Sequence, residues 1–242
     1  MTFFCRIADL CVRFDTRYEK AKLYASDYLI PEPQKCDLSL AVSDREIDET
    51  LADIPDHADI EDQRAYAEFI ALLRAFSREA STFDIFLLHA AVIEADGKGY
   101  AFFAPSGTGK STHIRLWRMR FGHAVNIVNG DKPFVRLVDG VFYAYGAPWC
   151  GKERWQRNVR VPLGGICELA RGEVDVCTRV SVSDATPILL SQIYLPDSPD
   201  GAGRVLELLD GVLRNVPVYH LSCTKNPLAA EVACRALLGK LL

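Results

Sequence analysis

Two glycines, a lysine and a serine stand at a fixed spacing between Ala104 and Ser111. The segment reads Ala-Pro-Ser-Gly-Thr-Gly-Lys-Ser, which fits a Gly or Ala followed by four residues and then Gly-Lys-Ser/Thr. Gly107 and Gly109 allow the backbone to turn its N–H groups towards an anion, and a helix that begins here adds unpaired N–H groups and partial positive charge. An apolar strand pattern precedes the segment and a helical pattern follows it. The sequence therefore predicts a phosphate-binding loop.

The residues of this loop have separable expected roles. The side chain of Lys110 should reach the β- and γ-phosphates of a nucleotide, and the hydroxyl of Ser111 should bind Mg²⁺. ATP and Mg²⁺ are therefore the expected ligands of the loop. The residues that we expect to bind the nucleotide are Ser106, Gly107, Thr108, Gly109, Lys110, Ser111 and Thr112.

Asp131 is the first carboxylate after the loop, and it follows Lys110 by only 21 residues. One helix and one strand fill that interval, so we expect a neighbouring strand to direct Asp131 at the γ-phosphate. A carboxylate at that position can bind Mg²⁺ or take a proton from a substrate hydroxyl. The alternative is a plain turn residue, because Asn-Gly and Lys-Pro, which surround Asp131, are turn dipeptides.

Several classes of phosphate-loop protein are disfavoured by missing motifs. Switch GTPases carry an Asn-Lys-x-Asp base reader, which the segment Thr-Lys-Asn-Pro at 224–227 does not match, and the Leu-Ser-Gly-Gly-Gln signature of transport ATPases is absent. Motor ATPases place an acidic pair on a strand much further downstream. The short interval to Asp131 is instead compatible with transfer of a phosphoryl group to a hydroxyl.

The segment 147–158, Ala-Pro-Trp-Cys-Gly-Lys-Glu-Arg-Trp-Gln-Arg-Asn, is the second place where reactive side chains gather. Lys152 is a candidate for stabilising the transferred charge, and Trp149 and Trp155 could stack on a base or a substrate. Cys150 lies beside cations that lower the pKa of a thiol. We expect an inert thiol at Cys150, and the alternative for the whole segment is a surface loop anchored by its tryptophans.

Charge is unevenly distributed along the chain of 242 residues, whose net charge is −4. Residues 1–88 hold 10 Lys and Arg against 18 Asp and Glu, a net charge of −8, whereas residues 110–160 hold 10 against 3, a net charge of +7. A basic segment around a phosphate loop suits a polyanionic ligand, and a solvated basic face is the alternative. The acidic total argues against wholesale nucleic-acid binding.

Cysteine spacing and hydropathy indicate the compartment. The eight cysteines form no Cys-x-x-Cys pair, so a zinc site is not expected. Arg6 and Asp9 interrupt the first apolar segment, which therefore lacks the features of a signal peptide. No apolar run approaches the roughly 20 residues of a membrane span. We expect a cytoplasmic protein with no membrane partner.

Periodicity divides the chain into two parts. Residues 3–42 alternate as short strands, including segments at 3–9, 10–16, 22–28 and 36–42, and the acidic segment 43–62 is expected to be a surface loop. A helix over 65–80 then places apolar residues on one buried face: Tyr66, Phe69, Ile70, Leu73 and Phe76. We expect a strand-rich α+β region over 1–83, which could dock a substrate or partner, and a catalytic domain over 84–242.

The second part alternates strands and helices. A strand over 85–95 and the strand before the phosphate loop should form a hairpin at Asp96-Gly97, and 134–145 should form another at Asp139-Gly140. The other expected elements are a helix from Lys110 to about Phe121, a strand at 123–131, a strand pair within 163–180, helices at 185–194 and 203–215, a strand at 216–223 and a final helix that begins at Asn226-Pro227. The expected fold class is α/β.

The segments Leu-Leu-His-Ala-Ala…Gly-Lys-Ser-Thr-His (87–113), Asn-Gly-Asp-Lys-Pro (129–133) and Tyr-Gly-Ala-Pro-Trp-Cys-Gly-Lys-Glu (145–153) resemble HPr kinase/phosphorylase-like proteins. The catalytic domain of these proteins is related to that of phosphoenolpyruvate carboxykinase. The resemblance covers roughly 84–170 and, more loosely, 216–233. It implies a mixed sheet with the phosphate loop at a cleft, and transfer of phosphate from ATP to a hydroxyl with Mg²⁺.

The same resemblance bears on three side chains. His89 falls where the family has a histidine near the phosphates or the base, and a histidine satisfied by backbone at the edge of the core is the alternative. Asp131 falls where the family has an acidic residue. The family commonly has two adjacent Asp residues there, whereas this chain has Gly130-Asp131, and Glu153 is a candidate for the second carboxylate. Because of this departure, phosphorolysis is less expected than kinase activity.

The sequence supports one leading hypothesis and two others. The leading one is an ATP-dependent kinase with Asp131, Lys110, His89 and Lys152 as catalytic residues, and with Ser111, Asp131 and Glu153 at the metal. Its acceptor would be a Ser/Thr hydroxyl of a small protein or peptide, or a small metabolite, and a homo-oligomer is compatible with it. The second hypothesis is a nucleotide-dependent binding module with weak or no phosphotransfer. The third, a carboxykinase acting on oxaloacetate, requires more metal- and carboxylate-binding elements than this length provides.

Overall fold

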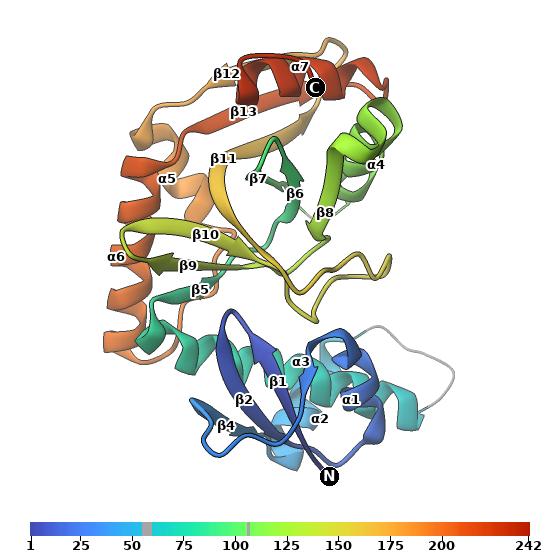
Figure 1. Ribbon diagram of the computed structural model, residues 1–242, viewed down its shortest axis with the longest axis vertical. Helices are drawn as coiled ribbons and strands as arrows, with labels where there is room; N and C mark the ends of the chain where they lie inside the picture. The colour runs from blue at the N-terminus through green and yellow to red at the C-terminus, as the bar shows by residue number, and fades with distance from the viewer. Residues whose placement is uncertain (55–59, 106) are drawn as a thin grey trace.

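A computed structural model describes residues 1–54, 60–105 and 107–242, and the two gaps are drawn in grey in Figure 1. The described residues form a four-stranded sheet near the N-terminus and a nine-stranded mixed sheet in the rest of the chain. Figure 1 shows the small sheet at one end of the molecule and the large sheet above it, with the two termini at opposite ends. The fold is thus α/β, as predicted, with a smaller strand-rich α+β region at the N-terminus.

The small sheet has the strand order β3-β1-β2-β4. Its strands are β1 (Thr2–Ile7), β2 (Leu10–Asp15), β3 (Leu29–Ile30) and β4 (Leu38–Ala41). The prediction of a strand at 22–28 is wrong, because this region holds the end of helix α1 (Glu19–Tyr24) and a short 3₁₀ helix (Ser26–Tyr28). Ala21, Ala25 and Tyr28 are all buried, and this spacing follows the period of a helix.

The acidic segment 43–62 is not the surface loop that its composition predicted. Helix α2 (Asp44–Ala52) begins at a capping box, in which the Ser43 side chain accepts from the Glu46 N–H and the Glu46 carboxylate accepts from the Ser43 N–H. Ile47, in the second turn of α2, is fully buried. The signal that was overlooked is the Ser-x-x-Glu spacing. Residues 55–59 of the predicted loop lie outside the described residues, and residues 60–62 begin the next helix.

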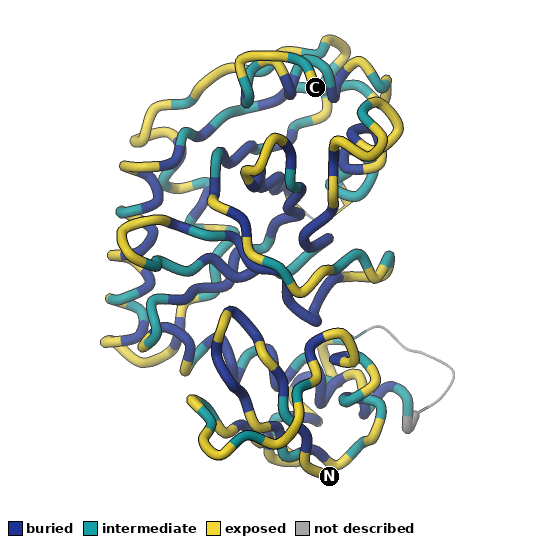
Figure 2. The backbone as a smooth tube through the Cα atoms, in the orientation of Figure 1, coloured by how far each residue is buried: buried dark blue, intermediate teal, exposed yellow. Residues whose placement is uncertain are grey.

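Helix α3 (Ile60–Ala80) connects the two sheets. Its apolar residues pack into one core together with the small sheet and with Phe134, Tyr145 and Trp149 of the large part. The predicted buried face is confirmed at Phe69 and Phe76, whereas Tyr66 remains 38% exposed. A helix buried against two layers needs apolar residues over more than one stripe, and α3 has them. Figure 2 shows α3 as a largely buried segment between the two parts.

The large sheet has the order β5-β9-β10-β11-β7-β6-β8, and β13 pairs with both β11 and β12. Its strands are β5 (Ile85–Leu87), β6 (Ala91–Ala95), β7 (Lys98–Phe103), β8 (Val125–Asn129), β9 (Phe134–Val138), β10 (Val141–Tyr145), β11 (Arg160–Arg171), β12 (Val176–Arg179) and β13 (Val218–Cys223). The predicted hairpins at Asp96-Gly97 and Asp139-Gly140 are confirmed. All four of these turn residues have positive φ, as such tight turns require.

Helices cover both faces of the large sheet. They are α4 (Lys110–Phe121), α5 (Val182–Leu190), α6 (Pro199–Asn215) and α7 (Leu228–Leu238). Helices α5 and α6 share one hydrophobic core with the sheet, and α4 and α7 share another. Figure 1 shows α6 along the left side of the large sheet, α4 at the right and α7 across the top. Helix α4 has the predicted bounds, and α7 begins one residue later than the predicted Pro227.

Two strand predictions in this part are wrong. The segment 85–95 is two strands, because β5 pairs with β9 while β6 pairs with β7 and β8, and the chain turns from one to the other at residues 88–90. The pair predicted within 163–180 does not form, because β13 lies between β11 and β12. Strand β11 has buried residues on both faces, and it pairs on both edges with parallel strands that local sequence does not reveal.

The strand directions bring several strand ends to one edge of the sheet. Strands β7 and β8 both run antiparallel to β6, so they are parallel to each other, and β7, β11 and β13 are also parallel. The residues that follow these strands therefore emerge at the same edge as the start of β6.

No helix in the described part of the chain is long and apolar enough to cross a membrane.

Candidate active site

The phosphate loop connects β7 to α4, as predicted. Gly107 has φ +77° and Gly109 has φ +131°, and both values lie in the region that favours glycine. Gly109 is the N-cap of α4, so the first N–H groups of this 12-residue helix are free to bind an anion. Ser106, which was expected to bind the nucleotide, lies outside the described residues. The two glycines and the start of α4 thus have the backbone conformation that the sequence predicted.

The Lys110 side chain turns back over the loop. Its Nζ donates to the Ala104 carbonyl at 3.1 Å and lies 3.2 Å from Nε2 of His89. Burial lowers the pKa of Lys110, since the charged ammonium loses water, and Lys132 also lowers it while Asp131 raises it. An anion beside this partly desolvated ammonium would favour its charged form.

His89 lies at the break between β5 and β6. Its N–H donates to the Gln192 carbonyl at 2.7 Å, which holds the break open. Its Nε2 lies 3.2 Å from Oδ1 of Asp131 and 3.2 Å from Nζ of Lys110. One ring nitrogen either donates to Asp131 or accepts from Lys110. One tautomer satisfies only one of these two contacts, and His89 lies between the cation and the carboxylate.

Asp131 follows β8 by two residues and faces the loop. Burial raises the pKa of Asp131, but a hydrogen bond from His89 and the charges of Lys132, His89 and Lys110 outweigh burial, so the pKa lies below its usual range. Lys132 Nζ lies 3.4 Å from Oδ2. The prediction of a directly neighbouring strand is wrong, because β6 lies between β7 and β8. Asp131 still reaches the loop because β7 and β8 end at the same edge.

Asn129 holds Asp131 in place, a role that the sequence reasoning missed. It is fully buried, and its Oδ1 accepts from the N–H groups of Asp131 and Lys132 at 2.8 Å each. Its Nδ2 donates to the carbonyls of Ala147 and Trp149. Asn129 thus connects the turn that carries Asp131 to the loop between β10 and β11. In the sequence, the Asn-Gly dipeptide indicates a turn and does not reveal the buried amide.

These groups surround one open cavity of about 410 Å³. Its walls come from the phosphate loop, the start of α4, the turn after β8 and the loop between β10 and β11. The lining residues are His89, Pro105, Gly107, Gly109, Lys110, Ser111, Thr112, Gly130, Asp131, Gly151, Lys152 and Glu153. Every predicted site residue that the structure describes lies in this wall except Thr108. The structure thus brings the four residues named as catalytic around a single cavity.

Gly130 is tightly enclosed by the loop between β10 and β11. A Cβ at this position would meet the Cys150 carbonyl oxygen at 2.9 Å and the Cβ of Trp155 at 3.4 Å. The Gly130 N–H also donates to the Trp155 carbonyl at 2.8 Å. A second carboxylate therefore has no room at residue 130 while the loop between β10 and β11 keeps this position.

We expect Gly130→Ala to destabilise the fold by about 1–3 kcal/mol, because backbone atoms must move to admit the methyl group. Gly203→Ala is the matched control, since a Cβ there meets nothing within 4 Å. This control is expected to stabilise α6 by about 0.5–1 kcal/mol. Urea unfolding of both variants measures the difference, and a neutral Gly130→Ala would contradict the enclosure.

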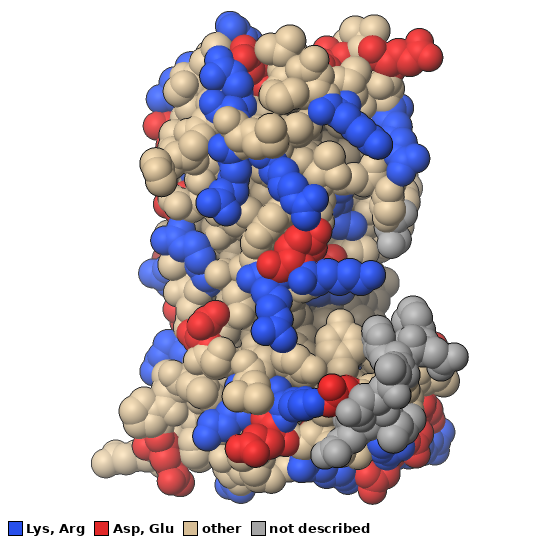
Figure 3. Space-filling view, turned by 90° about the vertical axis from the view of Figure 1, so that its right-hand side faces the viewer, with Lys and Arg blue, Asp and Glu red and all other residues tan. Residues whose placement is uncertain are grey.

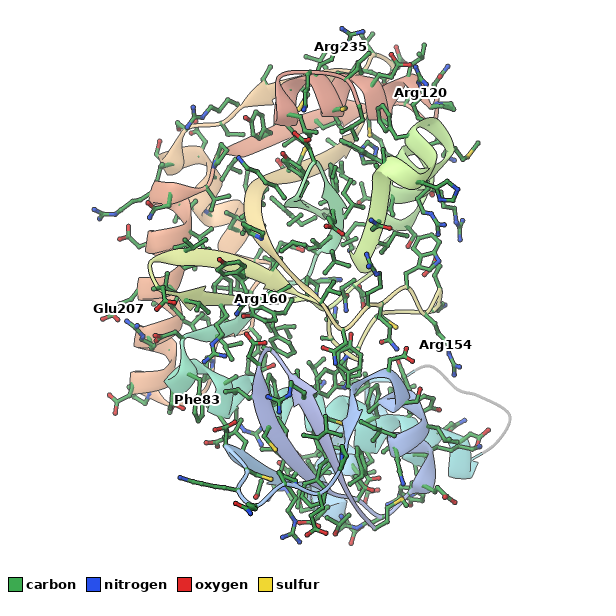
Figure 4. All side chains as sticks on the ribbon, in the orientation of Figure 1. Phe83, Arg120, Arg154, Arg160, Glu207 and Arg235 are labelled. Carbon is green, nitrogen blue, oxygen red and sulfur yellow. The ribbon has the colours of Figure 1, made fainter. Side chains whose placement is uncertain are left out.

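The loop between β10 and β11 is held by the N-terminal region. Trp149 is buried, donates from Nε1 to the Phe69 carbonyl at 2.7 Å and stacks on the Phe69 ring. The expectation that Trp149 stacks on a base or substrate is therefore wrong. Burial raises the pKa of Cys150 to about 11, which agrees with the expected inert thiol. Arg154 lies over the Tyr24 ring, and Figure 4 shows its side chain at the outer tip of the loop.

Glu153 and Lys152 lie on the exposed side of the cavity. The Glu153 carboxylate lies 3.4 Å from Arg115, whose guanidinium also covers the Trp155 ring. The described residues contain no group of three or more His, Cys, Asp or Glu side chains that could hold a metal. A metal here would depend on the oxygens of Ser111 and Asp131, and on Glu153 if it leaves Arg115.

Arg171 is a second residue that the sequence reasoning missed. From the end of β11, its guanidinium donates to the carbonyls of Gly107 at 2.6 Å and Thr108 at 3.3 Å. Arg171 is not among the residues that line the cavity, so it contacts the loop from outside. Arg171 therefore braces the phosphate loop from behind. No local pattern marks this arginine, because the contact spans 64 residues.

His113 is buried in α4 behind the loop, and its pKa falls to about 4 because burial disfavours the imidazolium. The unfolded chain therefore binds this proton near pH 6.5, whereas the folded chain does so only near pH 4. Stability attributable to His113 is complete above pH 6.5 and falls by on the order of 3 kcal/mol as the pH is lowered to 4.

The check on this pH dependence is urea unfolding as a function of pH. We expect His113→Gln to flatten the stability profile between pH 6.5 and 4 relative to the unsubstituted protein. His123→Gln, at an exposed histidine just after α4, is the control and should keep the slope. An unaltered slope in His113→Gln would show that the imidazole is not buried in its neutral form.

Comparisons with known proteins complete the description of the site. A solved structure of the Hpr(Ser) kinase/phosphatase from Coxiella burnetii is similar, with a TM-score of 0.36 and 11% sequence identity. The similarity covers 61% of this chain and 93% of that chain. No protein-family model matches the sequence. No curated protein sequence matches it either.

Proposed function

We propose that this protein is an ATP-dependent phosphotransferase that moves the γ-phosphate of ATP to a hydroxyl group. The observation that carries the proposal is the contact chain from Lys110 through His89 to Asp131, with both contacts at 3.2 Å, on the wall of the cavity that the phosphate loop also lines. A cation for phosphate and an ionised carboxylate for a proton thus lie on either side of one histidine.

The proposed reaction uses this arrangement directly. The N–H groups at the start of α4 and the Lys110 ammonium hold the β- and γ-phosphates. Asp131, ionised because its pKa is lowered, accepts the proton of the attacking hydroxyl. The hydroxyl oxygen bonds to the γ-phosphorus as the bond to the β,γ-bridging oxygen breaks, and ADP leaves with that electron pair. Lys152 is the candidate for stabilising the negative charge on the transferred phosphoryl group.

The oxygens around the cavity fit Mg²⁺. The Ser111 hydroxyl and the Asp131 carboxylate are hard oxygen ligands, and both line the cavity beside the loop. Glu153 would join them by exchanging its contact with Arg115 for the metal. When bound, Mg²⁺ would neutralise charge on the β- and γ-phosphates.

The acceptor is proposed to be a Ser/Thr hydroxyl of a small protein or peptide, or a hydroxyl of a small metabolite. Figure 3 shows Lys and Arg side chains gathered over the face that carries α4, above the N-terminal region. Arg115 and Arg157 on this side are paired with Glu153 and Glu94, so their charge is partly neutralised. Residues 1–83 are proposed to dock the acceptor, since they hold the loop that carries Lys152.

The experiment is an assay with ATP labelled at the γ-phosphate. The protein is incubated with Mg²⁺ and candidate peptides, small proteins and hydroxyl metabolites, and label on the acceptor is measured together with ADP. Label transfer with one ADP formed per transfer is the expected result. ADP production without any labelled acceptor would show that the protein hydrolyses ATP and does not transfer phosphate to these acceptors.

A nucleotide-dependent binding module is the second candidate, and the enclosure of Gly130 favours it. Asp131 is the one carboxylate in the turn 129–132, so it would serve both the metal and the proton. Calorimetry separates the two candidates. ATP binding without ADP production, even when cell extract supplies acceptors, would favour the module over the kinase.

A further inference from the structure

Two cysteines of the N-terminal region lie in contact with each other. Cys11 is the second residue of β2, and Cys36 lies two residues before β4. The Cys11 thiol donates to Sγ of Cys36 at 3.5 Å, although the two residues are 25 positions apart in the chain. Neither cysteine lines the open cavity, so the pair belongs to a part of the molecule that the proposed reaction does not use.

The backbone around this pair determines how closely the two thiols approach. The Cys11 N–H donates to the Asp37 carboxylate at 2.7 Å, and the Asp37 N–H donates to the Cys11 carbonyl at 2.9 Å. Parallel pairing of β2 with β4 continues from Val12 and Leu38. Cys36 therefore precedes a residue that is bonded twice to Cys11, and the contact between the two sulfurs follows from the pairing of the sheet.

The two thiols differ in their exposure to solvent. Cys11 is 7% exposed, whereas Cys36 is partly exposed. Burial, the hydrogen bond and charge of Cys36 and the charge of Asp37 raise the pKa of Cys11 to about 11, against the opposing charge of Arg6. Cys11 is therefore almost entirely a thiol near neutral pH, and an incoming oxidant meets Cys36 first.

Only a small movement separates this contact from a covalent bond. The sulfurs of a disulfide are about 2 Å apart, so the two must approach by about 1.5 Å. Cys36 lies in the segment 31–37, which contains no helix or strand, so its side chain can rotate without breaking a sheet hydrogen bond. We propose that Cys11 and Cys36 are a redox-active pair that forms a reversible disulfide by exchange with a small disulfide such as oxidised glutathione.

The reaction consists of two exchange steps. The Cys36 thiolate attacks one sulfur of oxidised glutathione, and the first glutathione leaves as a thiolate, which gives a mixed disulfide at Cys36. The Cys11 thiol then loses its proton, attacks Sγ of Cys36 and displaces the second glutathione thiolate. The two cysteine protons pass to the two glutathione thiolates. The cysteines thus lose two electrons, and the glutathione disulfide gains them.

The disulfide would restrain a turn that contacts the large sheet. Cys11 follows Asp9, in the turn between β1 and β2, by two residues. The Asp9 carboxylate accepts from the Tyr145 hydroxyl at 2.6 Å and from the Arg160 guanidinium at 2.7 Å. Oxidation therefore fastens the base of this turn to the segment before β4, and this consequence does not depend on the proposed function.

The test uses the full chain in a buffer with equal concentrations of reduced and oxidised glutathione. Free thiols are then blocked, and trypsin leaves Cys11 in the peptide 7–13 and Cys36 in the peptide 36–45. We expect these peptides to be linked, with at least about tenfold more of the linked pair than in protein unfolded in urea, where the thiols meet only by chain diffusion. A linked pair no more abundant in the folded protein than in the unfolded protein would overturn the proposal.

Unfolding in urea gives a second measurement. The oxidised protein should have a midpoint about 1 M higher than the reduced protein, because the closed loop constrains the unfolded chain, and dithiothreitol should reverse the shift. Cys36→Ser, at a partly exposed position, should lose the linked pair and the shift, whereas Cys223→Ser, at another partly exposed cysteine, should keep both. A shift that persists in Cys36→Ser, or that is absent from the unsubstituted protein, would contradict the proposal.

Discussion

Replacing Asp131 with Asn is expected to slow phosphotransfer by about 10²–10⁴-fold, the usual contribution of a general base. The amide keeps the size of the side chain but cannot take the proton of the acceptor. It also ends the charge attraction to Lys110 and Lys132. The rate is measured as label transferred from γ-labelled ATP under saturating ATP and acceptor.

The binding of ATP separates this loss from a collapse of the site. Lys110 and the N–H groups of α4 remain in Asp131→Asn, so the Kd for ATP without Mg²⁺ should stay close to that of the unsubstituted protein. Asp139→Asn is the matched control, because Asp139 lies in the exposed β9–β10 turn, where Asn tolerates the same positive φ. Undiminished transfer in Asp131→Asn would refute the proposed role of the carboxylate.

Replacing Trp149 with Ala is expected to cost about 3–5 kcal/mol in the free energy of unfolding. Trp149 is 3% exposed and lies 5.2 Å from the Phe69 ring, with Phe76 and Phe134 also in contact range. Its removal leaves a cavity at the junction between α3 and the large sheet. It also leaves the Phe69 carbonyl without its indole donor.

Two further variants separate the contribution of the hydrogen bond from that of the buried ring. Trp149→Phe keeps an aromatic ring but loses the hydrogen bond, so it should cost less than Trp149→Ala. Trp155→Ala is the control, because Trp155 is only partly buried beneath Arg115. Urea unfolding gives all three values. A loss in Trp149→Ala no larger than in Trp155→Ala would show that Trp149 does not join the two parts of the molecule.

The Trp149 contact also bears on the site. In the loop between β10 and β11, Trp149 packs against α3, and Gly151 follows two residues later. An added Cβ at Gly151 would lie 3.2 Å from the Cβ of Asp131. Gln156 donates to Asp27 and Asn158 donates to the Arg6 carbonyl, which add contacts to the N-terminal region. The position of Asp131 thus depends on a loop that the N-terminal region holds.

Short-range patterns were the reliable part of the sequence reasoning. The phosphate loop, the helix from Lys110 to Phe121 and the two Asp-Gly hairpins depend on residues within a few positions of one another, and the structure has all of them. The same local rules, applied by composition alone, failed at 43–62, where a capping box outweighs the acidic character of the segment. They failed again at 163–180, where a later strand inserts between two predicted partners.

By itself, the sequence predicted the chemistry of the loop: which backbone can turn around a phosphate and which side chains can hold it. Only the tertiary structure decided the neighbours of these groups. His89 and Asp131 meet because β6 starts where β8 ends, Gly130 is closed by Cys150 and Trp155, and Arg171 braces the loop from behind. Glycine conformation and helix capping are local, whereas these contacts join residues that only the pairing order of the sheet brings together.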